Sequence, residues 1–89
     1  MFADKEKENE LLAILDDCAH LLQPSVFTHI SDLAHAGEWG VALEELCNML
    51  YEDDSTISRS MLNRIQALGL AMKIDESSWR MLNELVSNE

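Results

Sequence analysis

Apolar side chains recur every three or four residues in five successive segments, and this spacing constrains the fold more than any other feature. At about 100° per residue, such a spacing puts the apolar side chains on one face of an α-helix. No segment alternates convincingly enough to predict a strand. We therefore predict a single all-α domain over residues 1–89, with about five short helices in a compact bundle. The first few and last few residues are expected to fray.

Proline, serine and glycine mark where the first three predicted helices begin and end. The first helix is predicted over residues 4–22, because Pro24 lacks a backbone N–H donor and interrupts the helical pattern. Ser25 is expected to cap the second helix, and Gly37 is expected to end it from a left-handed conformation. The third helix then covers residues 38–52.

The remainder of the chain is predicted to form two more helices. Residues 52–56 are polar and typical of a loop, after which Ser58 is expected to cap a fourth helix. Asp75 is expected to cap a last helix that begins before Trp79. The apolar side chains predicted to face the core from these two helices are Met61, Ile65, Leu68, Met72, Trp79, Leu82, Leu85 and Val86.

The segment HAGEWGVALEEL, residues 35–46, contains two glycines on either side of Trp39. Gly37 is explained as the end of the second helix. Gly40 falls in the first turn of the third helix, where it is expected to allow a close backbone approach. Trp39 is then expected to anchor this corner in the core.

The third predicted helix separates apolar from acidic side chains. Its predicted core face consists of Trp39, Ala42, Leu43, Leu46, Cys47 and Leu50. Glu38, Glu45 and Glu52 are seven residues apart, so they form a stripe on the opposite face, and Val41 interrupts this stripe with an apolar patch. The candidate partner-binding residues on this side are Glu38, Val41, Glu44, Glu45, Glu52, Asp53 and Asp54.

The net charge favours a basic protein as the partner. The chain carries 17 acidic and 6 basic side chains, a formal net charge of −11. No lysine or arginine lies between Lys7 and Arg59. Such a field repels nucleic acid and anionic membrane surfaces, so we expect no direct binding to either.

The cysteines and the N-terminal segment point to a reducing compartment. Cys18 and Cys47 lie within apolar helical patterns and lack the close spacing of a metal or redox site. The segment MFADKEKENE is charged where a secretory signal needs an apolar run, and no segment is apolar over the length of a membrane span. We therefore expect a soluble protein of the cytoplasm.

No residue pattern predicts catalysis, a cofactor or a metal site. In HISDLAH, His29 and His35 lie about 120° apart on a helix, so one ion cannot easily bind both of them and Asp32. Adjacent carboxylates such as Asp16 and Asp17 diverge by about 100°, which separates a general acid from a general base. No calcium-binding loop or glycine-rich phosphate loop is present. We predict that the protein is not an enzyme, and a metal-dependent hydrolase is the weakest alternative.

One ordered combination of short motifs resembles a known family. The segments are AGEWGVALEEL, the acidic helix end LYEDD, IS at the start of the next helix, LG near its end, and D and W before the last helix. Over residues 26–86 this combination resembles the MafI family of bacterial immunity proteins. The resemblance implies a small helical protein that binds and blocks a toxin inside the producing bacterium. It also implies a toxin of a contact-dependent inhibition system, delivered as a C-terminal domain.

The resemblance and the charge together lead to a hypothesis about the partner. Several such toxins are ribonucleases that cleave tRNA or other RNA, including EndoU-like enzymes, and their active clefts must be basic to attract phosphate. The predicted function is occlusion of that cleft by the acidic side of the third helix. A second candidate surface consists of Asp16, Asp17 and Asp32. The alternative function is a helical adaptor or dimerisation module that uses Val41 and Met49, and the oligomeric state stays open.

Overall fold

The computed structural model describes residues 4–87, and this part of the chain is all-α, as predicted. Part of the expected fraying falls on residues 1–3 and 88–89, which lie outside the described residues. The α-helices are α1 (Asp4–Asp17), α2 (Pro24–His35), α3 (Trp39–Glu52), α4 (Arg59–Ala71) and α5 (Ser77–Arg80). Two short 3₁₀-helices, η1 (Ala19–Leu21) and η2 (Met81–Leu85), follow α1 and α5. No helix within residues 4–87 has the length and apolarity needed to cross a membrane.

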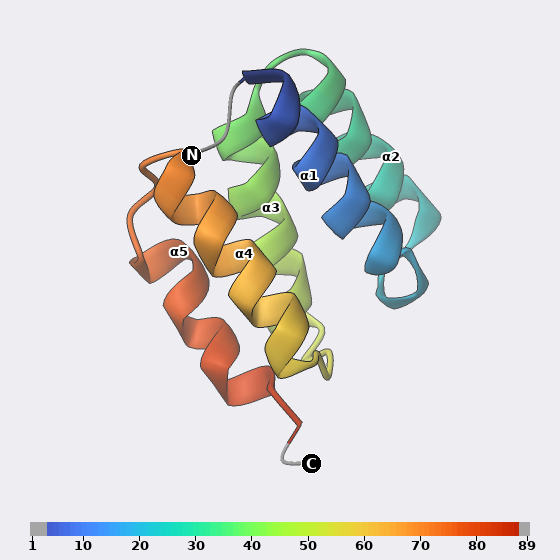
Figure 1. The fold of residues 1–89 in the computed structure, drawn as a ribbon. Coiled ribbons are helices and arrows are strands. Elements are labelled where there is room, and N and C mark those ends of the chain that lie inside the picture. Colours follow the sequence, from blue (N-terminus) through green and yellow to red (C-terminus); the bar gives the residue numbers. More distant parts are fainter. Residues whose placement is uncertain (1–3, 88–89) are drawn as a thin grey trace.

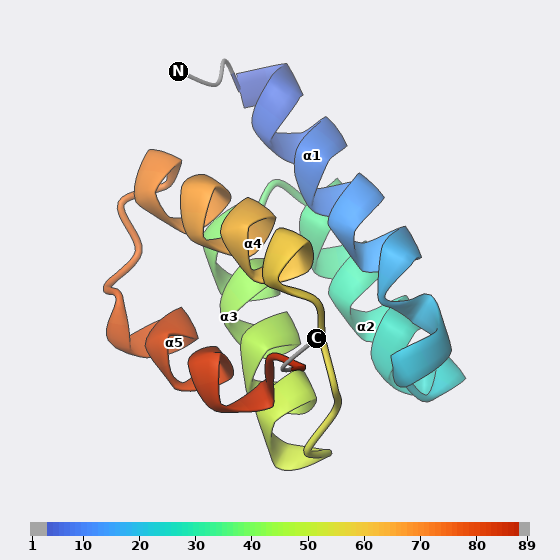
Figure 2. The same cartoon turned by 60° about the horizontal axis from the view of Figure 1, so that its bottom comes forward.

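The helices form two layers with α3 at the centre of one of them. Figure 1 and Figure 2 show α1 and α4 side by side in one layer, and α2, α3 and α5 in the other. The core between the layers receives apolar side chains from every α-helix. Its largest fully buried members are Leu11, Ile14, Leu15, Ile30, Leu43, Leu46, Leu50, Leu62, Ile65, Leu68 and Leu82. The predicted core face of α3 is confirmed except at Trp39, which is half-buried.

The predicted boundary between the first two helices is wrong by several residues. The α-helix ends at Asp17, and the chain then tightens into η1 before Leu22 becomes extended. The second helix begins at Pro24 itself, because the missing N–H of a proline costs nothing in the first turn. Gln23 precedes it and offers no side-chain cap, so the predicted cap at Ser25 is also wrong.

Each of the helices α2, α3 and α4 is followed by a residue with a positive φ. Gly37 has a φ of 84°, which confirms the predicted left-handed end of α2. Asp54 and Lys73 adopt the same conformation after α3 and α4, with φ values of 52° and 59°. Each end is closed by a backbone hydrogen bond across six residues, which is the Schellman motif. These bonds are Glu38 N to Leu33 O, Ser55 N to Leu50 O, and Ile74 N to Gly69 O.

A side-chain cap starts α4, whereas α5 is preceded by a side-chain hydrogen bond of Asp75, one residue before its cap position. Ser58 Oγ accepts a hydrogen bond of 3.0 Å from the backbone N–H of Met61, as predicted for the start of α4. Asp75 Oδ1 accepts one of 2.9 Å from the N–H of Ser77, and this bond lowers the pKa of the Asp75 carboxyl. Asp75 thus holds the first turn of α5, although Glu76 is the residue that directly precedes the helix.

The last two helices differ in detail from the predicted pattern. The helix predicted after Asp75 is one α-turn that continues as the 3₁₀-helix η2. In α4, Leu62 and Gly69 are buried, whereas Met61 and Met72 are half-buried. A parallel β-bridge, which the sequence pattern did not predict, joins Ile57 to Val86.

The close helix approach lies at Gly69 and not at Gly40. A Cβ added to Gly40 would lie 3.9 Å from the nearest atom of Ile74, an ordinary van der Waals distance. A Cβ added to Gly69 would lie 2.9 Å from both Cδ1 and Nε1 of Trp79. The indole ring therefore packs directly on the backbone of α4, and the prediction for Gly40 is wrong.

These distances predict opposite effects of alanine at the two glycines. Gly69→Ala should lower the free energy of unfolding by about 1–3 kcal/mol, because the added methyl group overlaps the buried Trp79 ring. Gly40→Ala should raise it by up to about 1 kcal/mol, because alanine has the higher helix propensity and meets no obstacle. Urea denaturation of the two variants beside the parent protein measures both effects. Equal stability of the two variants would contradict the close approach at Gly69.

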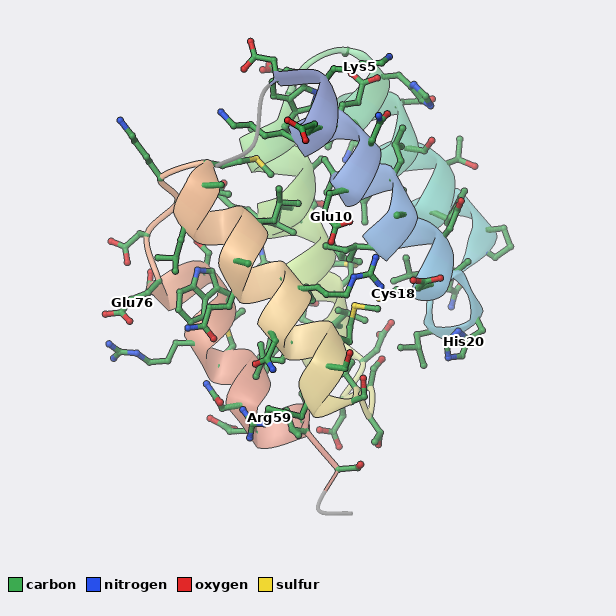
Figure 3. The ribbon with its side chains drawn as sticks, viewed as in Figure 1. Lys5, Glu10, Cys18, His20, Arg59 and Glu76 are labelled. Carbon is green, nitrogen blue, oxygen red and sulfur yellow. The ribbon has the colours of Figure 1, made fainter. Side chains whose placement is uncertain are left out.

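The cysteines lie in the core, where the thiols are shielded from solvent. Cys18 points inward between α1 and α4, whereas His20 nearby points outward (Figure 3). Burial raises the pKa of the Cys18 thiol to about 11 and that of Cys47 to about 12, from an ordinary value of 9.0. Both thiols are therefore neutral in the folded protein at physiological pH.

The raised pKa values predict a loss of stability in alkali. Because the folded-state pKa exceeds the unfolded one, the contribution of each thiol is complete below pH 9 and is lost as the pH rises towards 12. The urea midpoint should therefore fall between pH 9 and pH 11. The double variant Cys18→Ala/Cys47→Ala should show a flatter profile over this range. Parallel profiles of the two proteins would argue against ionisation of these thiols as the cause.

Candidate functional site

The outer face of α3 carries a row of carboxylates that begins at its N-terminus and continues past its C-terminus. We call the residues Glu38, Val41, Glu44, Glu45, Glu52, Asp53 and Asp54 the acidic α3 surface. All of these side chains are exposed except Glu45, which is half-buried. The row extends about 21 Å from Glu38 to Glu52, given a rise of about 1.5 Å per residue. The 3.6-residue period thus predicted correctly which side of α3 faces the solvent.

Most carboxylates of this surface have no counter-ion within the described structure. Glu45 Oε2 lies 3.8 Å from Nε2 of His29 on α2. The other carboxylates, those of Glu38, Glu44, Glu52, Asp53 and Asp54, form no side-chain hydrogen bond or ion pair with any part of residues 4–87. Their negative potential is therefore not cancelled by neighbouring side chains.

Arg64 and Arg80 neutralise acids elsewhere on the molecule. Arg64 on α4 donates to Glu10 at 3.2 Å and to Asp17 at 2.6 Å, and both acids belong to α1. Arg80 donates to Glu76 at 2.6 Å on α5. These arginines are therefore paired with acids that do not belong to the acidic α3 surface.

The residues at the C-terminal end of α3 are unfavourable for the stability of the fold, both in their charge and in their backbone conformation. Three consecutive acids, Glu52 to Asp54, lie where the helix dipole is negative, although cations are favoured there. The backbone of Asp54 also adopts the left-handed conformation, in which a glycine would be less strained. Folding alone does not favour an acid at these positions, which is the pattern expected when residues serve another purpose.

Two exposed apolar side chains lie on the outer side of α3. Val41 is 48% exposed and Tyr51 is 40% exposed. The Tyr51 hydroxyl donates to Glu84 Oε1 of η2 at 3.2 Å, and the negative charge of Glu84 raises the pKa of that hydroxyl. Tyrosine is enriched in protein interfaces, so Tyr51 is a further candidate contact that the sequence analysis missed. In the sequence, its position directly before the acids Glu52 to Asp54 could have indicated this role.

The second candidate surface is not one continuous patch. Asp17 is directed towards α4 by its ion pair with Arg64. α1 and α2 are antiparallel neighbours (Figure 1), so the end of α1 lies beside the start of α2. Asp16 belongs to the last turn of α1. Asp32 is eight residues after Pro24, or about 12 Å further along α2. The structure thus keeps the members of this set on separate parts of the molecule.

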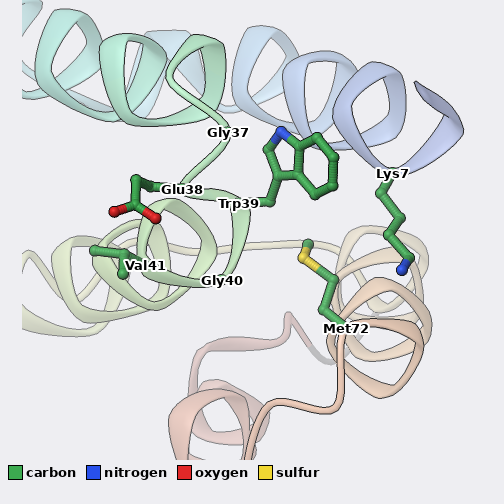
Figure 4. A pocket seen from close by; sticks show the side chains of 7 residues that line it. All are labelled: Lys7, Gly37, Glu38, Trp39, Gly40, Val41 and Met72. Atoms are coloured by element: carbon green, nitrogen blue, oxygen red, sulfur yellow. The ribbon is translucent and has the colours of Figure 1, made fainter. Parts of the chain in front are cut away.

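A hollow of about 320 Å³ lies at the N-terminal end of the acidic α3 surface. Lys7 of α1 and Met72 after α4 approach Trp39 from one side, whereas Glu38 and Val41 point to the other side (Figure 4). Trp39 Nε1 donates to Ala34 O at 3.1 Å and to Glu8 Oε1 at 3.2 Å, so this ring is fixed between α1 and α2. The predicted anchor is therefore held by hydrogen bonds as well as by partial burial.

Metal-binding side chains do not gather in the described structure. Within residues 4–87, no group of three or more histidines, cysteines, aspartates or glutamates has a geometry that could hold an ion. His29, Asp32 and His35 are all exposed on α2, and His29 is directed towards Glu45. The acidic α3 surface is thus the strongest candidate site in the part of the chain that the structure describes.

Comparisons with protein-family models, with curated proteins and with solved structures find no match to this chain.

Proposed function

We propose that this chain is an immunity protein that binds a bacterial toxin domain and blocks it in the cytoplasm of the producing cell. One observation carries the proposal, namely the row of exposed carboxylates on α3 without counter-ions in the described residues. Such a surface is complementary to the basic cleft of a nuclease. The resemblance of residues 26–86 to the MafI family supports the same function.

The mechanism that we propose is occlusion without chemistry. The toxin would be the C-terminal domain of a contact-dependent inhibition protein, with an EndoU-like ribonuclease favoured. The carboxylates of α3 would occupy positions that the phosphates of tRNA or another RNA take in the toxin cleft. Val41 and Tyr51, which are partly exposed, would add apolar contact area between the charged groups.

A mixed assay tests this function directly. The gene that lies next to the one for this chain is expressed, and its C-terminal domain is assayed for RNA cleavage with and without an equimolar amount of the protein. Loss of cleavage together with a stable one-to-one complex is the expected result. Undiminished cleavage in the presence of a molar excess of the protein would reject the immunity function.

The alternative is a helical adaptor or dimerisation module without a toxin partner. It is favoured by the exposed apolar side chain of Val41 and by the half-buried Met49 about two turns further along α3. Light scattering after size-exclusion chromatography distinguishes the dimerisation module from the immunity protein. A dimer that dissociates in the Val41→Glu variant, together with no effect on the neighbouring gene product, would favour the module.

A further inference from the structure

The ring of Tyr51 lies on the same side of α3 as part of the acidic α3 surface. Tyr51 is in the last turn of α3 and follows Glu44 by seven residues, so the two side chains lie about 20° apart around the helix. The Tyr51 side chain is 40% exposed, and Glu52 follows it directly in the chain. The acidic side of α3 therefore includes one large aromatic side chain.

A hydrogen bond to another helix fixes the outer end of this ring. The Tyr51 hydroxyl donates to Glu84 Oε1 at 3.2 Å, although the two residues are 33 positions apart. Glu84 belongs to η2, in which Leu82 and Leu85 are buried. The backbone that carries the Glu84 carboxylate is therefore anchored in the core.

This bond affects the orientation of the ring more than the stability of the fold. Both side chains are exposed, so water competes for the hydroxyl and for the carboxylate. The ring is attached to α3 at one end and held by Glu84 at the other, which restricts both of its side-chain torsions. A side chain that is ordered before binding loses less conformational entropy when a partner covers it.

We propose that Glu84 is a positioning residue for partner binding, because it holds the Tyr51 ring in the orientation that packs against a basic protein partner. The inference rests on the proposed function and deepens it, since Tyr51 makes the contact and Glu84 acts through Tyr51. The partner is basic because the exposed carboxylates of Glu44 and Glu52, which are unpaired within residues 4–87, lie along the same helix. The contact region thus extends from α3 to η2.

The orientation of the ring is testable without a partner, because Tyr51 is the only tyrosine of the chain. Selective ¹³C labelling of tyrosine gives NMR signals of this ring alone. Glu84→Ala should average the side-chain torsions of Tyr51 and lower the pKa of its hydroxyl towards the ordinary 10.0, because the charge and the acceptor of Glu84 are lost. Glu84→Gln keeps an acceptor oxygen, so the ring should stay ordered although the pKa of the hydroxyl falls.

The contribution to binding is measured by calorimetric titration with the C-terminal domain encoded by the neighbouring gene. Tyr51→Ala should weaken the affinity at least about tenfold, as is typical of a central aromatic contact. Glu84→Ala and Tyr51→Phe should each weaken it about 3- to 10-fold, because both keep the ring but release it. The double variant Tyr51→Phe/Glu84→Ala should bind no more weakly than either single variant, since both changes remove the same bond.

Glu84→Gln is the matched control for the charge of Glu84. It should bind within about twofold of the parent protein, because the hydrogen bond to the ring is retained. Its urea midpoint should equal that of Glu84→Ala, so that a difference in affinity between the two variants does not reflect a difference in folding.

Three results would overturn the proposal. A ring that is as ordered in Glu84→Ala as in the parent protein would show that Glu84 does not position it. Equal losses of affinity in Glu84→Gln and Glu84→Ala would assign the effect to charge. Parental affinity in Glu84→Ala would reject this inference alone, whereas a parent protein that does not bind the domain would reject the immunity function.

Discussion

Replacing Trp79 with alanine is expected to lower the free energy of unfolding by about 3–5 kcal/mol. The indole ring is 6% exposed and packs on the backbone of α4 at Gly69. Its removal leaves a cavity between α3, α4 and η2 that the surrounding helices cannot fill without moving. Urea denaturation followed by circular dichroism measures this loss.

Phenylalanine at the same position is the matched control. Trp79→Phe keeps most of the apolar ring and removes an indole N–H that is buried without an acceptor in residues 4–87. Its cost should therefore be well below that of alanine. A loss of less than about 1 kcal/mol in Trp79→Ala would mean that α5 contributes little to the core, contrary to the structure.

On the proposed immunity function, reversing two charges on the acidic α3 surface is expected to slow association with the toxin domain by about 10- to 100-fold at low salt. Glu44→Lys/Glu52→Lys is the most informative pair, because both side chains are exposed and neither has a partner in the described structure. The fold should tolerate the change, since a lysine at Glu52 interacts favourably with the C-terminal end of the helix dipole. Stopped-flow association with the toxin domain at several ionic strengths gives both the rate and its salt dependence.

The comparison for this experiment is Asp16→Lys/Asp32→Lys, which changes the net charge by the same amount on the second candidate surface. If α3 faces the toxin, this variant should retain nearly the parental rate and salt slope. If Asp16→Lys/Asp32→Lys associates more slowly than Glu44→Lys/Glu52→Lys, the interface lies on α1 and α2 instead. Identical rates for all three proteins would exclude electrostatic steering by either surface.

The helices and the face of α3 were predictable because they depend on local periodicity. A 3.6-residue repeat identifies which side of a helix is buried wherever it packs, and the hydrogen bonds of the Ser58 and Asp75 side chains reach only two or three residues along the chain. Two of the wrong predictions, the end of α1 and the cap at Ser25, concern a local helix boundary, whereas the wrong prediction for Gly40 involves contacts between distant segments. Whether Gly40 or Gly69 receives another side chain depends on where Trp79 lies, and the sequence pattern contains no such information.

The candidate site was predictable in part for the same reason. The exposed carboxylates of α3 follow from their spacing, and the separation of acids from basic residues is visible along the chain. The hydrogen bond between Tyr51 and Glu84 was not predictable, because η2 lies beside the end of α3 only through tertiary packing and the Ile57–Val86 bridge. The left-handed backbone at Asp54 was missed because such positions are normally glycine.

The different surroundings of the two tryptophans give the protein separate optical reporters. Trp39 is half-buried at the hollow beside Glu38 and Val41, whereas Trp79 is enclosed in the core. Emission from Trp39 therefore responds to a partner that covers the N-terminal end of the acidic α3 surface. Emission from Trp79 responds to loss of the core, so single-tryptophan variants distinguish binding from unfolding by fluorescence.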